Sequence, residues 1–239
     1  MAVIYGPNIV LDGLVCCLDA NDPKSYNGSG NTWTDVVGGY NAGLYNSPTH
    51  TQPVAGLSKA ITLDGVDNYI YNTNLPGGDS SFTIDIWVYH NGTDQGSSYG
   101  IYSGGNGNKP LFYAHGTQMG SGHYFPDNIS GTDYFNNYSS TTNQTWVHYV
   151  HTYANITVDN TSNVHKGYKN GALGGTNTTN FNNSGDGGGG NGFALGTYSS
   201  GNTDTYYKGS FGSFRYYNKT LSDAEVKQNF EAHRKRYGV

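Results

Sequence analysis

Glutamates, which often carry acid–base catalysis, are few in this chain. Its 239 residues include two glutamates, Glu225 and Glu231, and both fall in one C-terminal segment where helix capping and solvent contact account for them. Hydrolysis of a glycosidic bond, for comparison, needs two carboxylates that face the bond from about 5–10 Å apart. Serine, histidine and aspartate are scattered without an order that would define a nucleophile and its base. The sequence therefore predicts a protein that is not an enzyme.

Two histidines and two glycine-rich stretches match binding motifs only in part. His148 and His151 lie in a run typical of a β-strand, where residues three apart point to opposite faces, so they cannot share a metal ion. Residues 104–107 and 187–190 have the composition of phosphate-binding loops, but no segment that would begin a helix follows either of them. We interpret both stretches as ordinary loops.

The middle of the chain, residues 99–138, concentrates tyrosine, histidine, asparagine, aspartate and glycine without the alternation of a core strand. A tyrosine or histidine ring combines a flat apolar face with a polar edge, which suits stacking on a sugar ring. We expect any ligand contact to come from five side chains of this segment: Tyr102, Tyr113, His123, Tyr124 and Tyr134. The alternative, which the sequence leaves open, is that the segment covers a sheet or contacts a neighbouring subunit.

Strands must position these side chains, and the clearest strand pattern covers residues 82–89, where apolar and polar residues alternate. Its apolar face and one residue of a second strand, 146–153, are predicted to fill the core: Phe82, Ile84, Ile86, Val88 and Val150. Asn170-Gly171 suits the type I′ turn of a hairpin. Many short strands without helices between them predict an all-β fold, an antiparallel sandwich of two sheets.

The two ends of the chain are expected to meet. Residues 14–18 indicate a buried first strand and residues 207–217 an aromatic-rich last strand, and we predict that both belong to one sheet system. Ser222 followed by Glu225 forms a capping-box pair that begins one short C-terminal helix. The basic run 234–236 favours the negative end of that helix. We expect the helix to pack outside the sheet.

Composition limits the class of protein. Charged residues make up 12% of the chain, whereas glycine (36) and tyrosine (22) are abundant, which suits one large β domain or two small ones. A net charge of −5 gives no electrostatic reason to expect nucleic-acid binding. Adjacent Cys16 and Cys17 are expected to act as small apolar residues rather than as a disulfide. With neither a signal segment nor an apolar run of membrane-spanning length, we expect synthesis in a cytoplasm and no membrane insertion.

Several motifs follow one another along the chain in a characteristic order. They are Trp146-x-His148-x-Val150-x-x-Tyr153, Tyr168-x-Asn170-Gly171, Leu195-Gly196 and Tyr216-Tyr217-Asn218-x-x-Leu221-Ser222-x-x-Glu225-Val226, preceded by the turn Leu63–Tyr69. Together they resemble the laminin-G/concanavalin A-like jelly-roll family, which includes lectins, adhesion modules and glucanases. The resemblance implies a single jelly-roll domain over residues 1–239. Glucanase members carry glutamates beside a strand aspartate, but here Thr83 and Trp87 flank Asp85 on its face, so the resemblance does not imply hydrolysis.

The same resemblance implies one candidate metal, calcium. Some laminin-G-like members hold calcium with loop carboxylates at the rim of the sandwich. Five aspartates here carry the oxygen ligands that calcium prefers: Asp64, Asp67, Asp127, Asp133 and Asp186. No D-x-D-x-D pattern groups them, so we expect Asp64 and Asp67 to shape a turn and the others to be solvated, without a cofactor.

The opening of the chain, residues 14–35, and the ending Arg236-Tyr237-Gly238 are similar to modules in structural proteins of tailed marine bacteriophages. This resemblance implies a virion surface protein, made in the host cytoplasm and attached to capsid or tail proteins, as a capsid decoration or a tail or fibre component. Attachment to host surface glycans and a homo-oligomeric state are open options. The alternative is a dedicated carbohydrate-binding lectin or adhesion module that is not tied to a virion.

Overall fold

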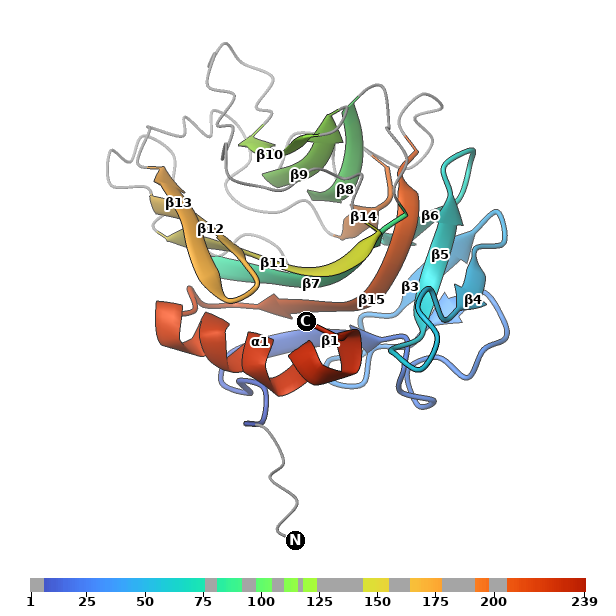
Figure 1. The fold of residues 1–239 in the computed structure, drawn as a ribbon, viewed down its shortest axis with the longest axis horizontal. Helices are drawn as coiled ribbons and strands as arrows, with labels where there is room; N and C mark the ends of the chain where they lie inside the picture. The colour runs from blue at the N-terminus through green and yellow to red at the C-terminus, as the bar shows by residue number, and fades with distance from the viewer. Residues whose placement is uncertain are drawn as a thin grey trace, which may run out of the picture.

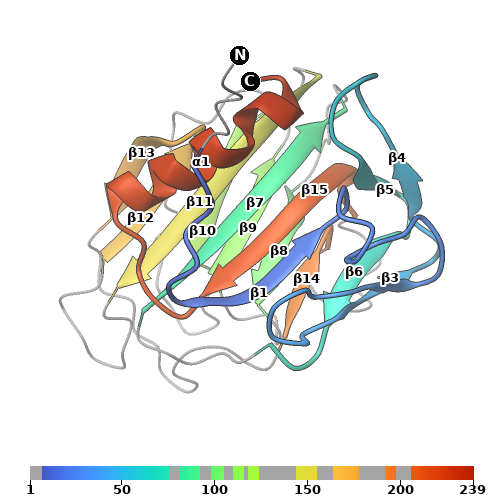
Figure 2. The same ribbon diagram turned by 90° about the horizontal axis from the view of Figure 1, so that it is seen from below.

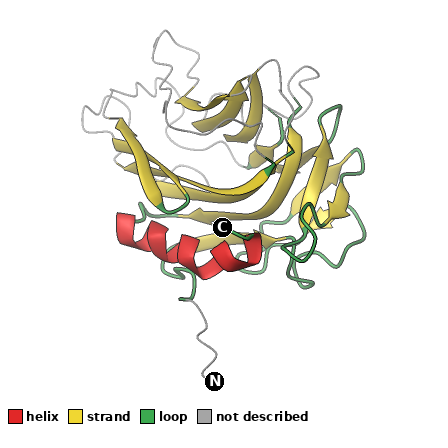
Figure 3. Cartoon of the chain, in the orientation of Figure 1, coloured by secondary structure: helices red, strands yellow, loops and turns green. Residues whose placement is uncertain are grey.

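The computed structural model (Figure 1) describes residues 7–75, 81–91, 98–104, 110–115, 118–123, 144–154, 164–177, 192–197 and 206–239. For the three strands between residues 98 and 123 it describes the backbone. The described residues form two antiparallel sheets and one C-terminal helix (Figure 3), which confirms the predicted two-sheet sandwich. Within these residues, no helix combines the length and the hydropathy needed to cross a membrane.

The first sheet has eight strands and carries the helix on its outer face. Its order across the sheet is β13 (Ala172–Asn177), β12 (Val164–Lys169), β11 (Thr145–Ala154), β7 (Phe82–His90), β15 (Lys208–Tyr217), β5 (Ala60–Asp64) and β4 (Thr49–Thr51), with β1 (Leu14–Asp19) also paired to β15. The helix α1 (Asp223–Tyr237) lies across this sheet in Figure 2, on the side away from the second sheet.

The second sheet has seven strands and faces the inner side of the first. Its order is β10 (Gln118–His123), β9 (Pro110–His115), β8 (Ser98–Gly104), β14 (Phe193–Leu195), β6 (Tyr69–Asn72), β3 (Ala42–Tyr45) and β2 (Thr32–Trp33). One hydrophobic cluster joins both sheets: the Phe193 ring of β14 stacks on the Phe214 ring of β15 with centroids 4.2 Å apart. The core therefore lies between the two sheets.

The alternation along β7 places its apolar face in this core, as predicted. Phe82, Ile84, Ile86 and Val88 are all buried members of the cluster between the sheets. The prediction for Val150 is wrong in its location, because this residue is buried on the opposite face, beneath α1. In the register of β11 and β7, Val150 lies opposite Asp85 rather than opposite a core residue, and cross-strand partners share a face.

Strand β15 organises the first sheet. One of its edges pairs with β7, while its other edge pairs first with β5 and then with β1. The pairing of β15 with β7 shifts register between Phe211 and Ser213, and at this bulge the carbonyl of Gly212 accepts a hydrogen bond from Ala20 N at 2.9 Å. The predicted meeting of the first and last strands is confirmed.

The caps of α1 follow the predicted pattern. Ser222 and Glu225 form a reciprocal capping box, and three basic residues occupy the last turn. Gly238 ends the helix in the left-handed conformation with φ +73°, donating to the carbonyls of Arg234 and Lys235. The last turn is also tied to β1, since Arg236 Nη2 lies 2.7 Å from Asp19 Oδ2. The helix is therefore attached to the sheet at its C-terminal end as well as by its apolar face.

Candidate functional site

Of the five residues predicted to contact a ligand, three lie in strands whose backbone alone is described, and two lie outside the described residues. Tyr102, Tyr113 and His123 occupy β8, β9 and β10, which are consecutive strands at one end of the second sheet. In the backbone register Tyr113 lies opposite Gly100 and Gly120. Tyr124 and Tyr134 lie outside the described residues. A ligand contact by these residues stays a prediction.

The predicted turn role of Asp64 is confirmed. Its Oδ1 accepts the backbone N–H of Val66 at 2.8 Å and those of Asp67 and Asn68 at 3.4 Å each, so the carboxylate closes its own turn. Of the other candidate calcium ligands, Asp127, Asp133 and Asp186 lie outside the described residues. Over the residues that the structure describes, no three His, Cys, Asp or Glu side chains are grouped to hold a metal ion.

Asp85, the strand aspartate compared above with the glucanase pattern, is fully buried. Its Oδ1 accepts a hydrogen bond from Arg215 Nη1 at 2.9 Å and lies 3.1 Å from His148 Nε2, and all three side chains are fully buried. Burial raises the pKa of the Asp85 carboxyl, but the interactions with His148 and Arg215 outweigh it and hold that pKa well below its usual range. The carboxylate is therefore ionised and has no access to solvent.

Helix α1 supplies the remaining partners of this buried cluster. Asn229 Nδ2 donates to Asp85 Oδ2 at 2.8 Å and to the Tyr217 hydroxyl at 2.9 Å, while Asn229 Oδ1 accepts from Val10 N at 2.8 Å. Arg215 Nη2 is hydrogen-bonded to His233 Nδ1, and burial together with the Arg215 charge lowers the pKa of His233 far below its usual value. His233 is therefore neutral, and the cluster attaches the helix to the sheet.

A row of tyrosines on and beside the second sheet, open to solvent at one end, offers aromatic rings to a ligand. The rings of Tyr45 and Tyr69 stack with centroids 4.7 Å apart and an interplanar angle of 4°, and Tyr69 continues to Tyr206 at 6.3 Å. Tyr71 meets the Tyr45 ring edge-on at 6.5 Å. We call these four residues the tyrosine row. Tyr45 is 41% exposed, which makes it the open end of the row.

Strand pairing explains why these rings gather. Tyr45 at the end of β3 is the cross-strand partner of Tyr69 at the start of β6, so the two side chains share one face of the sheet. Gly43 pairs with Tyr71 on the same face, and a Cβ atom at Gly43 would lie 2.7 Å from Cε2 of Tyr45. The glycine therefore leaves the space into which the Tyr45 ring folds.

Two turns hold the exposed end of the row in place. Asn46, which follows Tyr45 with φ +62°, donates from Nδ2 to the carbonyl of Asp67 at 2.7 Å. Asn68 Nδ2 donates in return to the carbonyl of Asn46 at 2.8 Å. Burial raises the pKa of Tyr69, and the neighbouring tyrosines raise it further, so its hydroxyl stays protonated at neutral pH. The row thus combines fixed aromatic rings with hydroxyl and amide groups, which is the chemistry of sugar recognition.

The tyrosine row was not predicted from the sequence. The alternation of Tyr69 and Tyr71 around Ile70 indicated a strand with one aromatic face, but Tyr45 and Tyr206 are distant in sequence. Only the pairing of β3 with β6 and the return of the chain before β15 bring the four rings together.

Comparison with known proteins places the fold in a family. A family model described as the concanavalin A-like lectin/glucanases superfamily matches residues 64–227. No curated protein sequence matches the chain significantly. The extent of the domain, predicted as residues 1–239, stays a prediction.

Solved structures share this fold at low sequence identity. Trypanosoma rangeli sialidase in complex with sialic acid is 16% identical with a TM-score of 0.68, over 98% of this chain and 36% of that chain. The binding domain of botulinum neurotoxin serotype D/C is 15% identical with a TM-score of 0.60, over 91% and 51%. Botulinum neurotoxin type C, whose cell entry depends on two ganglioside molecules, is 15% identical with a TM-score of 0.60, over 91% and 50%. The chain thus spans about a third to a half of these structures.

Proposed function

Because the chain belongs to the concanavalin A-like lectin/glucanase superfamily, we propose that it is a non-catalytic carbohydrate-binding module whose tyrosine row contacts the sugar. The observation that carries the proposal is the stacked pair of Tyr45 and Tyr69, held on paired strands with Tyr45 open to solvent. A sugar ring presents apolar C–H faces and polar edges, which match an aromatic ring beside hydroxyl groups.

The structural neighbours support a glycan as the ligand class. One is a sialidase bound to sialic acid and another is a neurotoxin whose cell entry depends on gangliosides, which are sialylated glycolipids. Their low identity means that they support the proposal through the fold, while the position of the site comes from this chain's own residues.

The described carboxylates support a non-catalytic role. Asp85 is sealed beneath α1, Glu225 caps the helix, and Glu231 lies 3.4 Å from Arg234 on the helix surface. Glycoside hydrolysis by the usual acid and nucleophile requires two carboxylates that face a bound sugar. The two glutamates are instead held in ion pairs, Glu225 with Lys219 and Glu231 with Arg234.

A glycan array with the purified protein, followed by titration of the best ligand, tests the proposal. Replacing Tyr45 with alanine should weaken binding by about 2- to 13-fold, equivalent to about 0.5–1.5 kcal/mol for one aromatic contact. Leu173→Ala is the matched control, because Leu173 is 47% exposed on β13 of the other sheet. Equal binding by wild type, Y45A and L173A would refute the role of the tyrosine row.

The same assay compares the tyrosine row with the middle segment predicted from the sequence. A variant that replaces Tyr102, Tyr113, His123, Tyr124 and Tyr134 with alanine should bind as wild type if the row alone makes the contact. Loss of binding in this variant together with full binding by Y45A would move the site to the middle segment.

We further propose that the module is displayed on a virion surface, attached to capsid or tail proteins and aiding adhesion to host glycans. The support is the resemblance of residues 14–35 to modules of tailed-phage structural proteins. Mass spectrometry of purified virions tests whether the protein is part of the particle. Absence of the protein from the particles would refute the setting and leave carbohydrate binding untouched, in favour of a lectin or adhesion module outside a virion.

A further inference from the structure

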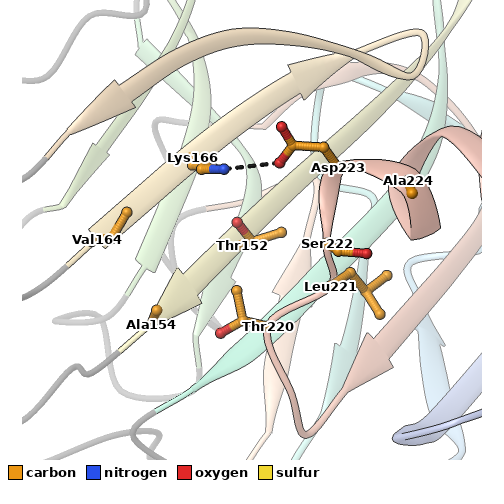
Figure 4. Close-up of a pocket in the computed structure, with 9 residues that line it drawn as sticks. All are labelled: Thr152, Ala154, Val164, Lys166, Thr220, Leu221, Ser222, Asp223 and Ala224. Carbon is orange, nitrogen blue, oxygen red and sulfur yellow. Dashed lines mark hydrogen bonds and ion pairs between the residues drawn. The ribbon is translucent and has the colours of Figure 1, made fainter.

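A pocket of about 580 Å³ lies where the first turn of α1 meets the ends of β11 and β12 (Figure 4). Its lining comes from three segments of the chain: Thr152, Ala154, Val164, Lys166, Thr220, Leu221, Ser222, Asp223 and Ala224. The pocket is separate from the tyrosine row, since in Figure 2 β12 and the start of α1 lie at the opposite end of the molecule from β3 and β6. Its volume falls in the range that accommodates a small molecule.

The floor of the pocket is fixed by hydrogen bonds and burial. Thr152 and Leu221 are each only 1% exposed. Leu221 N donates to Thr83 Oγ1 at 2.9 Å, and Thr220 Oγ1 donates to the carbonyl of Tyr153 at 2.7 Å. The segment that leads into α1 is therefore held against β7 and β11, and a ligand would meet a preformed surface.

An ion pair with no net charge lies at one rim of the pocket. Lys166 Nζ lies 2.8 Å from Asp223 Oδ1, and the Tyr168 hydroxyl donates to the same oxygen at 2.7 Å. These two hydrogen bonds lower the pKa of Asp223, so its carboxylate is ionised at neutral pH. In Figure 4 one carboxylate oxygen of Asp223 faces Lys166 and the other points away from it.

The lining combines this polar rim with apolar walls. Ala154, Val164 and Leu221 present methyl groups, while Thr152, Thr220 and Ser222 present hydroxyls (Figure 4). A ligand with an apolar face and adjacent hydroxyl groups satisfies both kinds of surface. Because the Lys166–Asp223 pair has no net charge, it selects neither an anion nor a cation, and a purely apolar ligand would desolvate the pair without replacing its water.

We propose that this pocket is a second binding site, specific for a small neutral ligand with vicinal hydroxyl groups, such as one or two uncharged sugar units. Two neighbouring hydroxyls would bind at the rim, one donating to Asp223 and the other accepting from Lys166, and the C–H face would lie on the apolar wall. The site does not require the tyrosine row to bind.

Titration of the ¹⁵N-labelled protein with methyl α-glucoside, methyl α-mannoside and methyl β-galactoside, followed by NMR, tests the proposal. At least one of these probes should cause saturable shifts of the amides of Thr152, Lys166, Leu221 and Ala224. Inorganic phosphate and sialic acid serve as anionic comparisons. Failure of all three neutral sugars to shift these amides, or saturable binding of an anion in preference to them, would overturn the assignment.

Two helix variants separate binding from folding. Ala224 is exposed and lines the pocket, so Ala224→Leu fills the space while keeping a good helix former. This substitution should lower the affinity for the sugar by about tenfold or more. Lys227→Leu places the same leucine three residues further along, at an exposed position that does not line the pocket, and should bind as wild type. Wild-type affinity in a folded A224L variant would overturn the proposal.

The tyrosine row is tested independently in the same titration. Tyr45→Ala should leave the shifts at the pocket unchanged, whatever it does to binding elsewhere. Loss of the pocket shifts in Y45A would mean that there is one site rather than two, and would overturn the second site without refuting carbohydrate binding.

Discussion

Replacing Asp85 with asparagine tests the reasoning about the buried cluster most directly. Asparagine keeps the size of the side chain but removes the charge that compensates Arg215, whose guanidinium is fully buried with Nη1 2.9 Å from Asp85 Oδ1. Burial lowers the pKa of Arg215, but the interaction with Asp85 outweighs it and raises that pKa, so the arginine stays charged. The variant therefore contains an uncompensated charge beneath α1.

Loss of one partner from a buried ion pair costs about 3–5 kcal/mol. This is a large part of the roughly 5–15 kcal/mol by which a domain of this kind is stable. Urea unfolding at neutral pH, followed by tryptophan fluorescence, measures the change, since Trp87 lies directly beside the cluster and stacks on His148 at 4.8 Å. Asp12→Asn is the matched control: Asp12 is 83% exposed and paired with Lys219, so its loss should cost less than about 1 kcal/mol.

The pH dependence gives the experiment a second readout. The pKa of Asp85 is lower in the folded state than in the unfolded chain, so its contribution is present above about pH 4, the ordinary aspartate value. That contribution is lost as the pH falls through the folded-state pKa. The stability difference between wild type and D85N should therefore be constant near neutral pH and shrink in acid. A cost below about 1 kcal/mol at pH 7, or a difference that grows in acid, would refute the reasoning.

Three further predictions concern stability. Ile86→Ala should cost about 2–5 kcal/mol in urea unfolding through a cavity between the sheets, and native-like stability would place this residue on the wrong face. A chain ending at Tyr217 lacks α1 and should lose cooperative thermal unfolding, because the buried cluster and its aromatic cover become exposed; an equally stable truncated chain would make the helix an independent appendage. Gly171→Ala should cost about 1–2 kcal/mol, because Gly171 has φ +75° and an added Cβ would lie 3.0 Å from Phe230; an unchanged midpoint would contradict this.

The elements that depend on local pattern were predictable. Alternation along residues 82–89 identified the core face, the spacing of Ser222 and Glu225 identified the start of α1, and Asn170-Gly171 identified a turn in which both residues have positive φ, as a type I′ turn requires. The order of motifs also identified the family that the comparison confirms.

The predicted core was wrong for Val150, because the face on which this residue lies depends on the strands paired with β11. Val150 follows an apolar alternation like that of the core strands, but on β11 both faces are buried, one by the second sheet and the other by α1. Apolar character alone therefore does not tell which face enters the core between the sheets. The register with Asp85 settles it, and register depends on the whole sheet.

The sequence by itself determined the class of fold, the caps of the helix and the scarcity of glutamates, because each depends on residue type and on spacing over a few positions. Only the tertiary structure decided how Asp85 is neutralised and where aromatic rings meet. Arg215 and Asn229 are 130 and 144 residues from Asp85, and the four tyrosines of the row come from three separate segments. Contacts of this range follow from strand pairing and chain topology, which no local pattern encodes.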